Sequence, residues 1–243
     1  MKTLLKEIRH NPLLWLLAFV PAVFAAHTLS PQSHTLHFVL SVLAIVPLAA
    51  LLSHATESVA AKTGDSVGGL LNATLGNLTE LVIAFTALRL GQYTLVKASI
   101  AGAIVANTLF MLGMSFLVGG LVHHVQEFNR GNARLQAGLL FVATIALLIP
   151  STVGEGDVET MTAVMHTLSI ALSVLLMAAY GLGLVFTLKT HRELFGSVDH
   201  GENDGSPWPL GLALSTLAGV TVLVALVSDI FVESVQGAAL AWG

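Results

Sequence analysis

Seven apolar stretches, each close to the roughly 20 residues that an α-helix needs to cross a bilayer, divide this chain. They cover residues 13–29, 36–53, 67–90, 94–122, 135–152, 161–187 and 209–228. Hydrophobic residues make up 55% of the chain and charged residues only 10%, whereas a typical soluble domain has about 25% charged residues. The pattern predicts an all-α, polytopic membrane protein with about seven transmembrane helices surrounded by membrane lipid.

The distribution of lysine and arginine predicts how these helices are oriented. Of the ten such residues, eight fall in alternate connections and therefore on one side of the membrane: Lys2, Lys6, Arg9, Lys62, Arg130, Arg134, Lys189 and Arg192. The other two, Arg89 and Lys97, lie on the opposite side. Because positively charged loops remain in the cytoplasm, the N-terminus is expected to be cytoplasmic. The short segment before the first stretch favours a bacterial plasma (inner) membrane over an organelle.

Charge and cysteine content narrow the classes of partner. The net charge of −4 and the absence of a basic patch predict no nucleic-acid partner. The chain has no cysteine, so it has neither disulfides nor a thiolate metal site.

The third stretch contains polar groups that hydrocarbon does not solvate. Asn72, Asn77, Thr79 and Glu80 lie within nine residues. At about 100° per residue they fall with Gly76 on one side of a helix, opposite an apolar arc. A carboxylate at the bilayer centre costs at least ~2.5 kcal/mol on insertion scales, so we expect this stripe to face protein or a water-filled cavity.

Carboxylate, amide, hydroxyl and backbone oxygens together form a ligand set for a hard cation. Ca²⁺ takes about six to eight oxygen ligands, whereas Zn²⁺ sites use cysteine or clustered histidine. Transporters often place ion sites at broken helices, and the glycines of this stretch weaken its helix. Alternatively, the amides and the threonine serve as interhelical hydrogen bonds, although a glutamate is costly for that purpose alone.

Further polar residues lie in the neighbouring stretches. Asn107, in the fourth stretch, either completes a site that faces the third stretch or makes a structural hydrogen bond. Glu57 follows the second stretch, and Asp229 and Glu233 follow the seventh, where the triplet ESV occurs in both places. The spacing of His54 and Glu57 is a poor indication of a metal site, because such pairs are common by chance.

Residues 54–113 resemble the calcium/proton antiporters, a cation/proton exchanger family of the calcium:cation antiporter superfamily. The resemblance is carried by ATES at 55–58, GGLLNATLGNLTEL at 68–81 and KASIAGAIVANTLFMLG at 97–113. It extends more loosely to LVSDIFVESVQGA at 226–238, and the first stretch corresponds to the family's extra N-terminal helix.

The resemblance implies a sodium/calcium-exchanger-like fold of two inverted repeats, each with a G-N-x-x-E-type motif on a kinked helix. Glu80 would then be the carboxylate that binds both the cation and the proton, and Asn77 its companion metal ligand. The cation- and proton-binding set would also include Asn72, Gly76, Thr79 and Asn107. Glu57, Glu233 and Asp229 would be gating or accessory acidic residues. Ala103 stands where many members have serine, which removes one ligand.

The same resemblance implies the domain boundaries. They are an N-terminal extra helix (1–35), a five-helix first repeat (36–190), an acidic cytoplasmic loop (191–208) and the first helix of an incomplete second repeat (209–243). The second acidic motif would follow the seventh stretch, and the chain ends at Gly243 before it. We therefore expect either a truncated exchanger or the N-terminal half of one, for which a second half-exchanger chain or a homo-oligomer is a candidate partner. The lysine and arginine bias argues against two copies inserted in opposite orientations.

The expected function is secondary active exchange of Ca²⁺ for H⁺, with Ca²⁺ as the transported ion and no cofactor. Exchange of another cation pair, such as Na⁺ and Ca²⁺, and an inactive half-exchanger fragment or subunit remain open alternatives. An intramembrane hydrolase that uses Glu80, or His54 with Glu57, is the weakest alternative, because the sequence contains neither GxSxG nor HExxH. The protein is accordingly not expected to be an enzyme.

Overall fold

The computed structural model describes residues 7–9, 11–152, 158–190 and 207–242, and these are helices and short connections. Within these ranges six helices are long and apolar enough to cross a membrane, and a bent pair of helices forms a seventh span. The six are Pro12–Leu29, His34–Thr63, Tyr93–Val122, Arg130–Pro150, Val164–Thr190 and Leu210–Trp242. The predicted all-α fold with about seven spans is confirmed.

The chain divides into two compact units, residues 1–102 with 203–243, and residues 103–202. In the first unit, the first span begins as a 3₁₀ helix, η1 (Pro12–Ala18), and continues as α2 (Phe19–Leu29). The Asn11 side chain caps η1 by accepting a hydrogen bond of 3.1 Å from the Leu13 N–H. Proline suits the first helical position because its missing N–H would have no helical partner there.

Helix α3 (His34–Thr63) continues past the second apolar stretch, as the sequence predicts. It ends at Gly64, whose φ of 81° lies in the left-handed region that glycine adopts without a steric penalty. Helix α11 (Leu210–Trp242) is longer than the predicted stretch 209–228.

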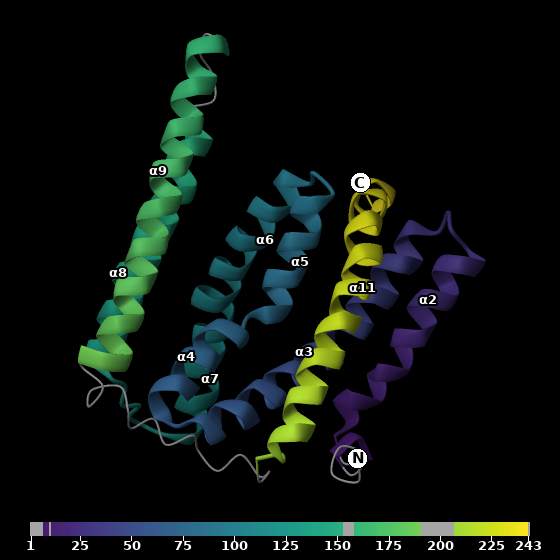
Figure 1. Ribbon diagram of the computed structural model, residues 1–243, viewed down its shortest axis with the longest axis horizontal. Coiled ribbons are helices and arrows are strands. Elements are labelled where there is room, and N and C mark those ends of the chain that lie inside the picture. The colour runs from purple at the N-terminus through teal and green to yellow at the C-terminus, as the bar shows by residue number, and fades with distance from the viewer. Residues whose placement is uncertain (1–6, 10, 153–157, 191–206, 243) are drawn as a thin grey trace. The chain divides into compact units, whose positions relative to one another are not determined.

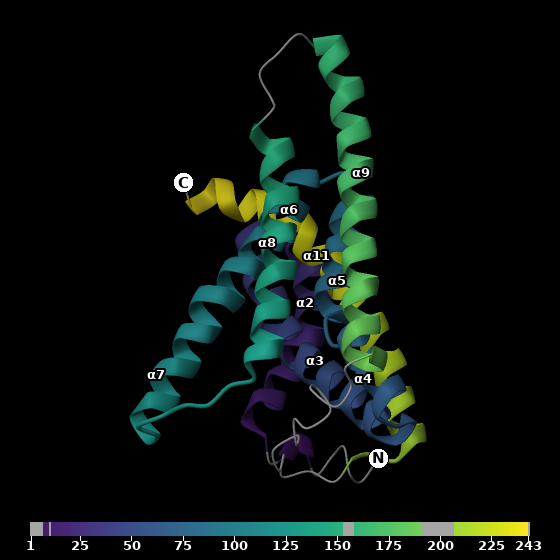
Figure 2. The same ribbon diagram turned by 90° about the vertical axis from the view of Figure 1, so that its left-hand side faces the viewer.

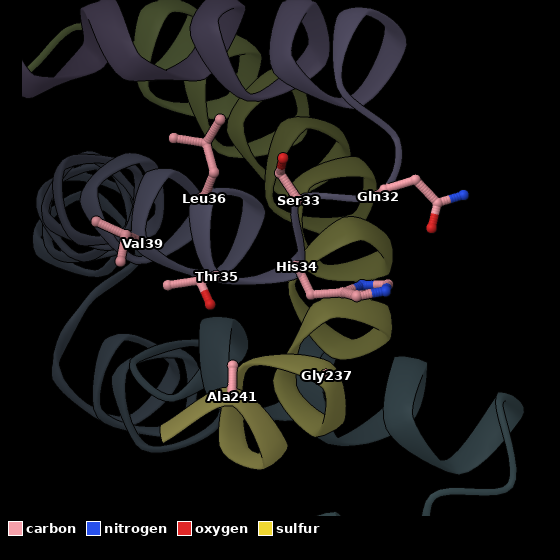
Figure 3. Close-up of a pocket in the computed structure, with 8 residues that line it drawn as sticks. All are labelled: Gln32, Ser33, His34, Thr35, Leu36, Val39, Gly237 and Ala241. Atoms are coloured by element: carbon pink, nitrogen blue, oxygen red, sulfur yellow. The ribbon is translucent and has the colours of Figure 1, made fainter. Parts of the chain in front are cut away.

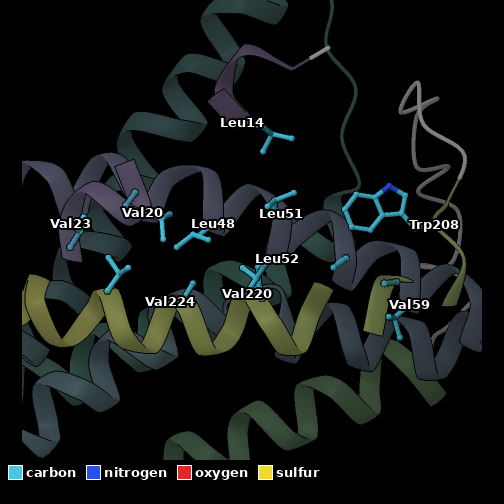
Figure 4. Packing of buried hydrophobic residues seen from close by; sticks show 14 of the residues in the cluster. Leu14, Val20, Val23, Leu48, Leu51, Leu52, Val59, Trp208, Val220 and Val224 are labelled. Carbon is cyan, nitrogen blue, oxygen red and sulfur yellow. The ribbon is translucent and has the colours of Figure 1, made fainter. Parts of the chain in front are cut away.

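The core of the first unit lies between α3, α11 and α2 (Figures 1 and 4). Helices α3 and α11 run antiparallel, because Ser58 lies beside Trp208 at one end of the pair and His34 beside Gly237 at the other. Buried leucine and valine side chains fill the space between them: Leu48, Leu51, Leu52, Val220, Val224 and Val227.

A bent pair of short helices follows α3. Helix α4 (Asp65–Leu75) and helix α5 (Leu78–Arg89) are separated by Gly76 and Asn77, and their axes differ by 43°. Helix α5 packs against α11. Helix α6 (Tyr93–Val105) comes next and continues into the second unit.

The second unit begins with a π-helical turn, η2 (Ala106–Met111), and α7 (Leu112–Val122). Helices α8 (Arg130–Thr152) and α9 (Val158–Val185) then lie side by side (Figure 2), and α9 ends in a second π-helical turn, η3 (Phe186–Thr190). None of the residues of α6, η2 and α7 is buried, and most of them are apolar. The acidic loop predicted at 191–208 lies outside the described residues except for its last two positions.

Candidate functional site

The predicted polar motif lies where the third span breaks. The Gly76 N–H donates to the Asn72 carbonyl at 2.9 Å, and α5 begins two residues later at Leu78. A Cβ atom at position 76 would lie 2.5 Å from that same carbonyl oxygen, closer than real Cβ contacts come. The break therefore requires glycine at this position, which the sequence identified only as a weak point in the helix.

Three of the predicted ligands lie on the exposed surface of the broken span, which is the bent pair of helices α4 and α5. Asn72, Asn77 and Glu80 are exposed. In the part of the chain that the structure describes, their side chains have no hydrogen bond or ion pair. Hydrocarbon cannot satisfy two amides and a carboxylate, so these groups are available to a cation, to water or to another protein surface.

The expectation of a single polar stripe is wrong for Thr79, which is only 6% exposed. Leu81 and Phe85, on the opposite apolar arc, are 61% and 59% exposed, which agrees with an arc that does not face protein. The projection assumed a straight helix, whereas the bend rotates α5, and its buried face is made by Thr79, Thr86 and Ala87. The role of Thr79 at the site remains a prediction.

The turn after α5 connects the broken span to α11. Gly91 has a φ of 69°, and Gln92 follows it. The Gln92 Nε2 donates to the Val232 carbonyl at 3.2 Å, next to Glu233. This hydrogen bond links the end of the helix that carries Glu80 to the helix that carries Glu233.

The acidic residues of α3 and α11 occupy matching positions. Glu57 and Glu233 are both exposed, and Asp229 is half-buried. When the two ESV triplets are superposed, buried positions coincide along both helices: Ala44 with Val220, Leu48 with Val224, Leu51 with Val227, Leu52 with Ser228, Thr56 with Val232, and Ser58 with Ser234. The likeness that the triplets indicate therefore extends over several helical turns.

Asn107 is exposed on the π-helical turn η2, in the second unit. Its neighbour Thr108 donates from Oγ1 to the Ile104 carbonyl at 2.6 Å. Single π-helical turns frequently occur at functional sites. The sequence did not predict this turn, and the place of Asn107 beside Glu80 remains a prediction.

Two other features of the first unit, an ion pair and a hollow, lack the grouped carboxylates that a cation site needs. His54 pairs with Glu7, at 3.1 Å between Nδ1 and Oε1, and sequence reasoning did not identify Glu7. A hollow between the start of α3 and the end of α11 is lined by residues such as His34, Thr35 and Val39, with no carboxylate among them (Figure 3). Within the described ranges, no three histidine, aspartate or glutamate side chains are grouped to hold a metal ion. The broken span thus presents a single carboxylate with two amides.

Known proteins resemble this chain in sequence and in structure. Residues 33–189 match the family model described as sodium/calcium exchanger protein. The chain is 38% identical over 237 residues to the Ca²⁺/H⁺ antiporter of Aphanothece halophytica, covering 92% of this chain and 63% of that protein. It is 36% identical to the Ca²⁺/H⁺ antiporter ChaA of Bacillus subtilis, covering 82% of this chain and 57% of that protein.

A solved structure is also similar. The structure of native YfkE matches with a TM-score of 0.73 and 31% identity, covering 95% of this chain and 64% of that one. The chain thus spans less than two thirds of the length of each of these proteins. Its multiple spans make it an integral multi-pass membrane protein. On the family model, this chain belongs to the sodium/calcium exchanger proteins, which are transporters and not enzymes, and within them it is similar to Ca²⁺/H⁺ antiporters.

Proposed function

We propose that this chain forms the first half of an antiporter that exchanges Ca²⁺ for H⁺, with Glu80 as the carboxylate that the two ions occupy in turn. The observation that carries the proposal is the exposure of Glu80, Asn72 and Asn77 on the broken span, where their side chains are unpaired in the described structure. Family membership and the similarity to Ca²⁺/H⁺ antiporters support the choice of ions.

The chemistry follows from the ligand set. A carboxylate accepts either a proton or a cation, and amide oxygens add further ligands for a hard cation such as Ca²⁺. Because the two ions compete for one group, a change in access from one side of the membrane to the other exchanges them. We assign Asn77 as the companion ligand of Glu80, and Gly76 as the residue that permits the break between α4 and α5.

A single carboxylate is too little charge to hold a divalent cation strongly in a membrane interior, because dehydration of the ion is costly. The proposed exchanger therefore needs a second acidic group. The residues 36–190 would form its first repeat, and 209–243 the first helix of a second repeat. The matching burial patterns of α3 and α11 support this division.

The proposed orientation places the N-terminus in the cytoplasm, and the proposed location is a bacterial plasma membrane. The bias of lysine and arginine supports the orientation, since eight of ten lie in alternate connections.

The test is to reconstitute the 243-residue chain in liposomes, impose a pH gradient and measure Ca²⁺ flux. Any Ca²⁺ flux that the pH gradient drives should be abolished by Glu80→Gln, because a neutral amide cannot alternate between proton and cation. Glu127→Gln, at an exposed position in the second unit, should leave the flux unchanged. If Glu80→Gln transports Ca²⁺ as fast as a wild-type chain that transports it, the assignment of Glu80 is contradicted.

Two other outcomes separate the alternatives. Flux driven by a Na⁺ gradient and not by a pH gradient would indicate exchange of Na⁺ and Ca²⁺ on the same fold. A correctly folded chain without flux under either gradient would favour a half-exchanger that requires a second chain, a candidate that the unpaired Glu80 also supports.

A further inference from the structure

A second polar cluster in the first unit lies apart from the broken span. Glu7 lies in the helical residues 7–9, His54 and Ser58 lie on α3, and Trp208 precedes α11. The two α3 residues are one helical turn apart and therefore lie on the same face of the helix. The cluster thus brings together three segments that are distant in the sequence.

One carboxylate connects these three segments. Glu7 Oε1 lies 3.1 Å from His54 Nδ1, and Glu7 Oε2 accepts a hydrogen bond of 2.8 Å from Trp208 Nε1. The His54 and Trp208 rings stack, with their centroids 4.5 Å apart and their planes 27° apart. The Ser58 Oγ accepts the backbone N–H of Trp208 at 3.2 Å.

The burial of Trp208 makes Glu7 necessary to this arrangement. Trp208 is 1% exposed and lies at one end of the apolar core (Figure 4). The indole N–H is a donor only, and a buried donor without an acceptor is strongly unfavourable. Without Glu7, the indole would have to leave this position to reach water or another acceptor.

We propose that Glu7 is a positioning residue that fastens the start of α11 to the end of α3, so that the N-terminal segment determines where α11 begins. Helix α11 starts at Leu210, two residues after Trp208, and the Ala213 N–H already donates to the Pro209 carbonyl at 3.0 Å. Displacement of the N-terminal segment therefore frees the first turn of α11. This inference goes beyond the proposed function and does not depend on it, because it concerns the packing of one indole.

The composition of the chain makes this proposal directly testable by fluorescence. The chain has three tryptophans, and Trp15 and Trp242 are 63% and 65% exposed. Replacing these two with phenylalanine leaves Trp208 as the only emitter. In this background we expect blue-shifted emission that aqueous acrylamide quenches weakly. Free N-acetyltryptophanamide in the same buffer gives the value for a fully accessible indole.

Glu7→Ala should shift the Trp208 emission to longer wavelength and raise its acrylamide quenching toward the value for the free indole. Glu7→Gln should retain the wild-type emission, because its amide oxygen still accepts the indole N–H and its amide nitrogen faces His54. Ser53→Ala is the matched control, since Ser53 is exposed on α3 beside His54 and should have no effect. Rescue by glutamine distinguishes the hydrogen bond from a general loss of fold.

A second measurement addresses a variant that loses its fold. Hydrogen exchange of the first amides of α11 should accelerate in Glu7→Ala and remain slow in Glu7→Gln, while α8 and α9 stay protected in both. If acrylamide quenches Trp208 as weakly in Glu7→Ala as in the wild type, the proposal is overturned. Hydrogen exchange of the first α11 amides that accelerates as much in Glu7→Gln as in Glu7→Ala would also overturn the proposal. So would exchange in Glu7→Ala that accelerates throughout the chain.

Discussion

At the scale of single residues, the break in the third span depends on the absence of one side chain. A Cβ atom at Gly76 would lie 2.5 Å from the Asn72 carbonyl oxygen, which is backbone and cannot move aside alone. Gly76→Ala should therefore destabilise the protein by about 1–3 kcal/mol, the usual cost of overpacking, and lower Ca²⁺ flux. Thermal unfolding of the purified protein, monitored by circular dichroism, measures the first effect.

The matched control for this substitution is Gly138→Ala in α8. No atom lies within 4 Å of a Cβ built at Gly138, so the new methyl group meets open space. Alanine is favoured over glycine in a helix by about 1 kcal/mol, so this variant should unfold at the same or a higher temperature. A Gly76→Ala protein as stable as the wild type would show that the break does not need glycine.

At the scale of helices, the close approach of α3 and α11 depends on Gly237. A Cβ at this position would lie 2.5 Å from the His34 ring, and the Cβ of His34 itself is 2.7 Å away (Figure 3). Gly237→Ala should therefore separate the two helix ends and cost about 1–3 kcal/mol of stability. The thermal unfolding midpoint reports the stability.

Gly211→Ala is the control on the same helix, because nothing lies within 4 Å of its added Cβ. It should unfold at the wild-type temperature or above. If both variants behave alike, the contact between His34 and Gly237 does not hold these helix ends together.

Helices are also the scale at which the sequence predicted most. Length and hydropathy are local quantities, so the spans and the continuation of α3 to Thr63 followed from them. The burial of Thr79 did not follow, because it depends on how α5 packs against α11. The contact between Glu7 and Trp208 joins residues 201 positions apart, and no local pattern indicates it. The ligand roles of Glu80 and Asn77 came from the family resemblance and remain predictions.

At the scale of the whole molecule, the exposed polar groups of the broken span are the surface that a second half-exchanger would cover. The absence of native cysteine allows this to be measured with single cysteines. In membranes that contain the chain alone, Glu80→Cys and Asn77→Cys should react with a water-soluble thiol reagent, because both positions are exposed. Thr79→Cys should not react, because this position is buried against the neighbouring helices.

Adding a segment from a relative should protect Glu80→Cys from the thiol reagent and leave Thr79→Cys unreactive. The part of the Aphanothece halophytica antiporter that this chain does not match is a suitable segment to add. When it is co-expressed, we expect Glu80→Cys to become protected from a bulky thiol reagent and wild-type chains to gain Ca²⁺ flux driven by a pH gradient. Continued reactivity of Glu80→Cys with no gain in flux would show that this segment does not cover the broken span. If the chain alone protects Glu80→Cys and transports Ca²⁺, copies of the chain must cover each other, and the second carboxylate then comes from a homo-oligomer.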